Sequence, residues 1–209
     1  MDIIIIGSGN VATRLGRKFR EAGHRILQVF SRNPSHAVLL AEILNATPIS
    51  ALSEMKTGAD LILLAISDNA YPEFVHELSP TGSFVVHTAG SVPMEVLKNT
   101  SSRYGVLYPL QSFRRELEDQ PEFPLLIDAN NPGSLEELKE MAAGLSKTIL
   151  PAGNEMRLKY HLAAVLAGNF SNHLYSLTES WCRREEIDFG LLQPLIRETA
   201  GRLLNELPE

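Results

Sequence analysis

The chain has 209 residues, enough for one α/β domain of ordinary size with a smaller segment beside it, and too few for two full domains. Hydrophobic residues make up 44% of the sequence and charged residues 21%, which excludes collagen-like, low-complexity and wholly disordered chains. The formal net charge of −6 disfavours nucleic acid as a partner, and the single cysteine, Cys182, excludes an internal disulfide and a cysteine-based zinc site.

The apolar runs are short, which bears on the cellular location. The clearest, at residues 61–66, falls far below the roughly 20 residues that a membrane-spanning helix requires. No cationic stretch precedes the isoleucines near the N-terminus, so an export signal is not indicated. We therefore expect a cytoplasmic protein that contacts neither membrane nor nucleic acid.

Strands and helices alternate over most of the chain. Ile3 to Ile6 are four consecutive β-branched residues, which predicts a strand buried on both faces of a sheet. An amphipathic helix is expected from Val11 to Ala22, ended by Gly23, with its basic residues on the solvated face. Further strands are expected at 26–30, 47–49, 61–66, 83–87, 105–108, 125–128 and 147–150, and helices at 33–44, 51–56, 70–78, 93–98 and 131–145. This alternation predicts a doubly wound, mainly parallel α/β sheet of the Rossmann type.

The pattern changes after residue 152, where no further strand is indicated. A long helix is expected from Glu155 to about Arg183 and a second one from Leu191 to Leu207. We therefore predict a dinucleotide-binding domain at 1–152 and a short all-helical domain at 153–209. Two helices cannot build a good core by themselves, and the apolar side from Leu162 to Trp181 exceeds what they can bury, so we expect a homodimer formed through these helices.

A glycine motif joins the first strand to the first helix. Residues 7–12, Gly-Ser-Gly-Asn-Val-Ala, have the form G-x-G-x-x-A. Gly7 permits the tight turn, Gly9 leaves room for a pyrophosphate, and the helix N-terminus offers free N–H groups to an anion. We expect a dinucleotide to be bound by Gly7, Ser8, Gly9, Asn10 and Val11; the alternative is a tight strand–helix turn without a ligand.

The end of the second strand indicates which dinucleotide is bound. A site that prefers NAD usually carries Asp or Glu there to hold the ribose 2′-hydroxyl, whereas this chain has Ser31, Arg32 and Asn33. A guanidinium can pair with a 2′-phosphate and a serine hydroxyl can donate to it, so we predict NADP(H) as the cofactor. Alternatively, Arg32 is an ordinary exposed cation.

Four segments together resemble a known family. They are the glycine motif with residues 31–33, the stretch His87-Thr88-Ala89-Gly90-Ser91, residues 108–113 (Tyr-Pro-Leu-Gln-Ser-Phe) and residues 160–169. The chain resembles bacterial Rossmann-like NADP-dependent oxidoreductases with a C-terminal helical domain of unknown function. They are related to pyrroline-5-carboxylate reductases, deazaflavin-dependent NADP oxidoreductases and β-hydroxyacid dehydrogenases. Such proteins commonly have histidine before the Pro-Leu pair, and Tyr108 at this position argues against proton transfer there.

The carboxyl ends of the predicted parallel strands supply the remaining site candidates, because ligands bind at that edge of an open sheet. Ala65, Ile66, Ser67, Thr88 and Ala89 are expected to form the wall of the nicotinamide pocket. His87 could belong to the same wall, but we slightly favour a structural role in which its ring is hydrogen-bonded. Gln111 offers a neutral donor to a polar substrate, although capping of its own loop is an equally good use.

One face of the predicted long helix combines small and polar residues. At about 100° per residue, His161 shares this face with Gly168, Asn169 and Asn172, away from the apolar side. We expect this face to close over the nicotinamide, with His161 as proton donor or substrate anchor and Asn169 orienting a carbonyl or carboxylate. His161 could instead bond only to a loop backbone. No metal site is expected, because no carboxylate completes a ligand set on this helix.

These observations favour an NADP(H)-dependent oxidoreductase that transfers hydride between nicotinamide and a small carbonyl or imine substrate. A non-catalytic NADP(H)-binding regulatory protein is the main alternative. A nucleotide-binding scaffold whose helices mediate self-association is a third possibility.

Overall fold

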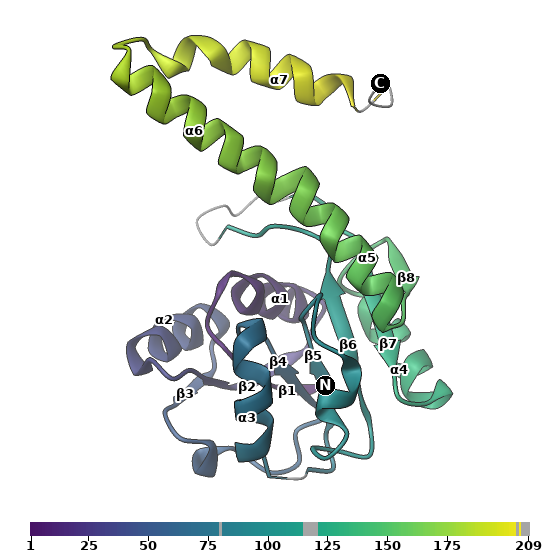
Figure 1. Cartoon of the computed structure of the whole chain (residues 1–209). Helices are drawn as coiled ribbons and strands as arrows, with labels where there is room; N and C mark the ends of the chain where they lie inside the picture. The colour runs from purple at the N-terminus through teal and green to yellow at the C-terminus, as the bar shows by residue number, and fades with distance from the viewer. Residues whose placement is uncertain (80, 115–120, 204, 206–209) are drawn as a thin grey trace. The chain divides into compact units, whose positions relative to one another are not determined.

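The computed structural model describes residues 1–79, 81–114, 121–203 and 205, which fall into two compact units, Met1–Leu162 and Ala163–Glu209. The first is an α/β domain and the second is helical (Figure 1). The division falls after Leu162 rather than after residue 152. The reason is that the first turns of helix α5 (Asn154–Ala164) bond to the α/β unit, through Asn154 and Arg157.

An eight-stranded sheet forms the centre of the α/β unit, in the order β3-β2-β1-β4-β5-β6-β7-β8. The strands are β1 (Asp2–Ile6), β2 (Arg25–Phe30), β3 (Thr47–Ile49), β4 (Leu61–Leu64), β5 (Phe84–His87), β6 (Tyr104–Pro109), β7 (Leu125–Ala129) and β8 (Ile149–Pro151). Neighbouring strands pair in parallel except β6 and β7, which are antiparallel. The predicted doubly wound, mainly parallel Rossmann sheet is therefore confirmed.

Helices cover both faces of this sheet. They are α1 (Asn10–Glu21), α2 (Pro34–Leu44), α3 (Tyr71–Glu77) and α4 (Pro132–Ala143), with 3-10 turns η1 (Leu52–Glu54), η2 (Asp68–Ala70) and η3 (Met94–Leu97). Apolar side chains of α1, α2 and α4 pack in one cluster on one face, and those of α3 and η3 pack on the other. The expected loop at 67–69 is in large part the turn η2.

Strand β1 lies in the middle of the sheet, between β2 and β4. Ile3 and Ile5 pack in the first cluster and Ile4 and Ile6 in the second, and none of the four is exposed. The prediction of a strand buried on both faces is confirmed. Each such side chain contributes about 1.5–3 kcal/mol by its burial, so the start of the glycine motif is held by a rigid strand.

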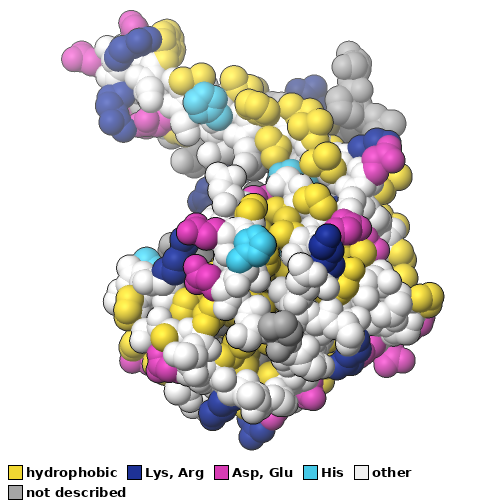
Figure 2. Space-filling view, turned by 60° about the horizontal axis from the view of Figure 1, so that its bottom comes forward, with side chains coloured by type: hydrophobic (Ala, Val, Ile, Leu, Met, Phe, Trp, Pro, Cys, Tyr) yellow, Lys and Arg dark blue, Asp and Glu magenta, His cyan; other side chains and the backbone are white. Residues whose placement is uncertain are grey.

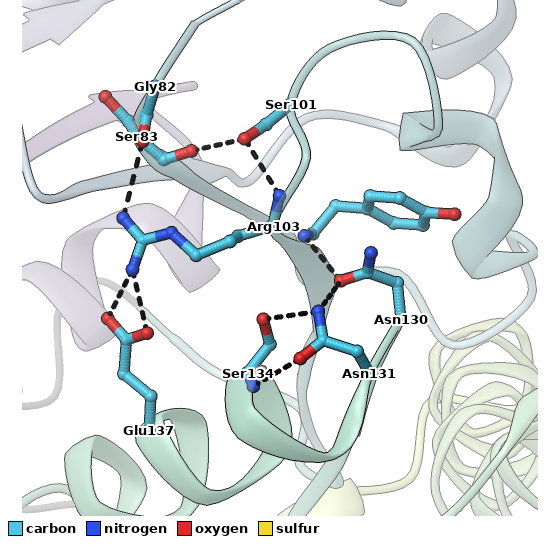
Figure 3. Close-up of polar contacts among 9 residues, drawn as sticks. Gly82, Ser83, Ser101, Arg103, Asn130, Asn131, Ser134 and Glu137 are labelled. Atoms are coloured by element: carbon cyan, nitrogen blue, oxygen red, sulfur yellow. Dashed lines mark hydrogen bonds and ion pairs between the residues drawn. The ribbon is translucent and has the colours of Figure 1, made fainter.

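Polar contacts fix the amino end of β6, away from the carboxyl ends of the parallel strands (Figure 3). The Arg103 guanidinium pairs with Glu137 of α4, with Nη1 and Oε2 2.8 Å apart. Asn131 caps the same helix by accepting a hydrogen bond of 2.9 Å from the Ser134 N–H. The predicted start of a helix at Asn131 is confirmed, and the contacts tie α4 to the antiparallel pair.

The second unit begins inside a continuous helical stretch. The chain passes from α5 through a π-helical segment η4 (Val165–Phe170) into α6 (Ser171–Arg184), and 3-10 turn η5 (Phe189–Leu192) leads into α7 (Gln193–Arg202). The expected long helix is confirmed with this π-helical interruption, which contains Gly168, a residue that weakens α-helix. The second helix begins at residue 193, and much of its expected end lies outside the described residues.

Apolar side chains follow one another along α6 and the segment before it, as the upper part of Figure 2 shows. We call the following residues the apolar stripe: Leu166, Phe170, Leu174, Leu177 and Trp181. Between 48% and 61% of each of these side chains is exposed in the single chain. None of the helices in the described parts of the chain is long and apolar enough to cross a membrane.

Candidate functional site

The carboxyl ends of β1, β2 and β4 meet around Gly7, where the order of the strands reverses. Gly7 has a φ of +117°, and a Cβ atom there would lie 2.1 Å from the carbonyl oxygen of Ala65. Its N–H donates to the carbonyl oxygen of Phe30 at 2.8 Å. Only glycine can hold this turn, and the crevice at such a switch point is where open α/β sheets bind ligands.

The N-terminus of α1 opens onto the same place. Gly9 is the N-cap, and apart from its two chain neighbours no atom of the described residues lies within 4 Å of the position that its Cβ would occupy. Within the described residues, no side chain accepts from the first N–H groups of this helix, and its first turn carries no acidic residue. Free N–H groups and the positive end of the helix dipole fit the pyrophosphate of a dinucleotide.

A cleft of about 290 Å³ lies in front of these two elements. Eight of its lining residues are ones that the sequence predicted for cofactor binding: Gly7, Ser8, Gly9, Ser31, Arg32, Ala65, Ile66 and Ser67. The cleft adds four residues that the sequence reasoning missed: Phe30, Asn33, Ala70 and Phe74. The Phe30 and Phe74 rings, with centroids 5.9 Å apart, give the cleft an apolar wall suited to a flat base.

The rim of the cleft carries the groups expected at a ribose phosphate. The Ser8 hydroxyl donates to the Ser31 hydroxyl at 2.8 Å, which in turn accepts from the Asn33 N–H at 3.3 Å. Arg32 is exposed and forms no ion pair with any residue that the structure describes. Among the residues that the structure describes, the lining contains no carboxylate, so the rim suits a phosphate better than a bare ribose.

Four other predicted cofactor residues do not line this cleft: Asn10, Val11, Thr88 and Ala89. The Asn10 side-chain amide instead donates to the carbonyl oxygen of Phe113 at 2.8 Å. The Thr88 hydroxyl donates to the carbonyl oxygen of Leu64, the last residue of β4, at 3.3 Å. Their roles toward a cofactor stay predictions.

A second polar group lies farther along the same edge of the sheet. The Tyr108 hydroxyl, at the end of β6, is 2.9 Å from Nδ1 of His161 on α5. A Cβ atom on Gly90 would lie 2.5 Å from the same nitrogen, so glycine is needed for the two rings to meet. Burial, and secondarily the charge of Asp68, raises the pKa of Tyr108 to about 12, with Arg157 acting in the opposite direction. The phenol therefore keeps its proton at neutral pH.

The contact between Tyr108 and His161 bears on the roles predicted for both residues. His161 has a side-chain partner rather than only a loop backbone. Tyr108, which the sequence argued against, supplies that partner. The sequence signal that could have identified Tyr108 as a site residue is its position at the carboxyl end of a predicted strand, beside the other site candidates.

His87 lies inside the fold and not on the wall of the cleft. It is fully buried, and its Nδ1 accepts from the Ala89 N–H at 3.2 Å. Burial, followed by the nearby Arg157 charge, lowers the pKa of His87 to about 3, although the Pro93 backbone opposes this shift. His87 is therefore neutral at pH 7, which agrees with a structural role.

Two predicted catalytic residues have no place in either group. Gln111 is exposed, and its Oε1 accepts from the Ser112 N–H at 2.9 Å, so it caps its own loop. Asn169 lies in the π-helical segment of the second unit and is exposed. Their catalytic roles stay predictions. Over the described part of the chain, no three His, Cys, Asp or Glu side chains form a group that could hold a metal ion.

This geometry defines a Rossmann dinucleotide-binding protein, and comparisons with known proteins agree. Residues 2–90 match the family described as NADP oxidoreductase, coenzyme F420-dependent. Residues 123–209 match a domain of unknown function, DUF2520.

Solved structures place the whole chain among such proteins. A candidate NADP oxidoreductase from Bacteroides fragilis is 35% identical, with a TM-score of 0.93 over 99% of this chain and 82% of that one. A 1-pyrroline-5-carboxylate reductase from Streptococcus pyogenes has a TM-score of 0.70 at 13% identity, over 100% of this chain and 82% of that one, and shares the fold. The chain belongs to the family of the Bacteroides protein, and it joins the oxidoreductase match at residues 2–90 to the DUF2520 match at residues 123–209.

A longer enzyme is similar to part of the chain. The glycerol-3-phosphate dehydrogenase [NAD(P)+] of Legionella pneumophila is 26% identical over 161 residues, which cover 66% of this chain and 49% of the enzyme. The chain thus spans about half the length of the curated relatives that it matches. The names of the Legionella enzyme and of the Bacteroides protein both describe oxidoreductases that use NAD(P) or NADP.

Proposed function

We propose that the protein is an NADP(H)-dependent oxidoreductase that transfers hydride between nicotinamide and a small carbonyl or imine substrate. The observation that carries the proposal is the cleft at the β1–β4 switch point, which has Gly9 at its floor and Ser31 and Arg32 at its rim. No carboxylate lies among the described residues that line the cleft, which supports NADP over NAD.

Different groups of the site bind different parts of the cofactor. Gly9 and the first turn of α1 hold the pyrophosphate, and Ser31 and Arg32 hold the 2′-phosphate. When bound, the nicotinamide supplies or accepts the hydride. Tyr108 and His161 hold the proton that a carbonyl oxygen or imine nitrogen needs once its carbon has taken the hydride.

Substrate-dependent oxidation of NADPH tests the proposal. Purified protein should consume NADPH with at least one member of a panel of small ketones, 2-oxo acids and cyclic imines, measured by the loss of absorbance at the dihydronicotinamide band. Tight binding of NADPH with no turnover of any member would favour the non-catalytic alternative. Failure to bind NADPH at all would contradict both readings.

The Arg32→Asp variant tests the choice of cofactor. The substitution replaces a phosphate partner with a repelling carboxylate, and a charge-assisted contact of this kind contributes about 1.5–3 kcal/mol. Calorimetric titration should show that the variant binds NADPH about tenfold more weakly or worse, and that its preference moves toward NADH. Arg184→Asp, with the same charge change on α6, serves as the control. An unchanged preference in Arg32→Asp would rule out the 2′-phosphate assignment.

A second copy of the chain is the partner that we propose for the apolar stripe. Five large side chains of η4 and α6, each about half exposed, form the kind of apolar surface that marks an interface. Light scattering should give twice the 23.1 kDa mass of the chain. Leu174→Lys should give the monomer mass, whereas Ser176→Lys, about a third of a helical turn away from the stripe, should not. A monomeric wild-type protein at micromolar concentration would exclude the dimer.

A further inference from the structure

The chain after β5 is held by side chains from the start of α5. Oδ1 of Asn154 accepts a hydrogen bond of 3.0 Å from the Met94 N–H, and its Nδ2 donates to Glu95 at 2.7 Å. One amide side chain thus fixes the backbone and a side chain of the turn η3.

Arg157, one turn farther along α5, holds the same segment. Its Nη2 donates to the Val92 carbonyl oxygen at 2.7 Å and to Oδ1 of Asn154 at 2.8 Å. Nη1 is 4.0 Å from Oδ2 of Asp128, and only 1% of the Arg157 side chain is exposed. Nε and Nη1 have no hydrogen-bond partner among the residues that the structure describes.

A buried guanidinium that is paired so incompletely is costly to the fold. Burial lowers the pKa of Arg157, against the opposing pull of Asp128, and burial raises the pKa of Asp128. An apolar side chain of similar size would carry no such penalty. What Arg157 contributes instead is a fixed position for the segment, because its guanidinium joins the Val92 carbonyl oxygen to Asn154.

The other end of residues 88–95 is bonded to residues that flank the cofactor cleft. The Thr88 N–H donates to the carbonyl oxygen of Leu64 at 3.1 Å, and the Ser91 hydroxyl donates to Asp68. Leu64 and Asp68 flank residues 65–67, which line the cleft. Residues 88–95 therefore bridge the end of β4 and helix α5.

The same face of α5 carries His161. Asn154, Arg157 and His161 follow one another at helical spacings of three and four residues, so they project from one side of the helix. The Gly90 backbone lies against the His161 ring in the middle of the held segment. One helix face thus sets the position of the segment and of the Tyr108–His161 pair.

We propose that Asn154 and Arg157 are positioning residues that hold residues 88–95 against the nicotinamide half of bound NADP(H). The proposal rests on the proposed function. It predicts an effect confined to one half of the cofactor. The phosphate and base contacts come from the ends of β1 and β2 and from α1 and α3, whereas the hydrogen bonds that the structure describes for these two side chains go to residues 92–95 and to each other.

Two ligands separate the halves of the cofactor. NADP⁺ carries both, whereas adenosine 2′,5′-bisphosphate carries the 2′-phosphate and the base but no nicotinamide. In calorimetric titrations, Arg157→Lys and Asn154→Ala should each bind NADP⁺ about tenfold more weakly than wild type and bind the bisphosphate within about twofold of wild type. Lys159→Ala is the matched control, since this exposed residue of α5 pairs with Glu155 and should change neither affinity.

Hydrogen exchange gives a second measurement that needs no ligand. The backbone of residues 88–95 should exchange faster in both variants than in wild type, while β1 exchanges at the wild-type rate. Asn154→Ala keeps the test decisive if Arg157→Lys does not fold. Equal weakening of both ligands, or no weakening of either, overturns the positioning role. A wild-type protein that binds neither ligand overturns the proposed function, and this inference with it.

Discussion

Tyr108→Phe is expected to lower the rate of NADPH-dependent reduction about 100-fold, the usual contribution of a positioned acid. The affinity for NADPH should stay within about twofold of wild type, because the phenol does not line the cofactor cleft. The substitution removes the hydroxyl that lies 2.9 Å from Nδ1 of His161 and keeps the ring. Stopped-flow measurement of hydride transfer on an accepted substrate separates this step from binding.

The double variant shows whether the two residues act as a unit. If they do, Tyr108→Phe with His161→Gln should be about as slow as either single variant, because effects within one catalytic unit are not additive. Tyr104→Phe makes the same change at the other end of β6 and should leave the rate unchanged. Full turnover in His161→Gln, with the fold intact, would remove His161 from the catalytic step.

Acid should destabilise the fold through His87. Its pKa is lowered from 6.5 to about 3 in the folded state, first by burial, so the unfolded chain binds the proton more readily. Its contribution to stability is therefore complete above pH 6.5 and is lost as the pH falls toward 3. The free energy of unfolding should drop by up to about 1.4 kcal/mol per pH unit across this window from this group alone.

His87→Gln isolates that effect. Denaturant unfolding of wild type and variant at pH values from 8 to 4 gives the difference between their free energies of unfolding. The free energy of unfolding of wild type minus that of the variant should be constant at alkaline pH. It should fall steadily below pH 6.5, because glutamine does not titrate. A difference that stays constant down to pH 4 would show that His87 is not held neutral by the fold.

The central part of the fold was predictable because its signals are local. Four isoleucines followed by Gly7 predict a buried strand and a tight turn, and the structure shows both. The place of Ser31 and Arg32 at the end of the second strand could be predicted from the length of one strand–helix–strand unit. The antiparallel pairing of β7 was not predictable in this way, because a run such as Leu125 to Ile127 is equally apolar in either direction.

The rest of the candidate site depends on contacts between distant parts of the chain. Tyr108 meets His161 across 53 residues, and Arg157 meets Val92 across 65. In the sequence, Arg157 is simply a charged residue on an amphipathic helix, where exposure is the usual outcome. Its burial is decided by the way α5 packs, and no periodicity in the sequence carries that information.

The position of β1 has a consequence for synthesis of the protein. This strand lies between β2 and β4, yet β4 is translated long after it. Translation adds about 5–20 residues per second, so several seconds pass between the synthesis of Ile3 to Ile6 and that of β4, the second strand that pairs with them. During that time a short, uncharged, β-branched segment has an open edge, the kind of sequence that pairs with other chains. Slow translation or high expression should therefore favour aggregation of the nascent chain through this strand, however stable the finished sheet.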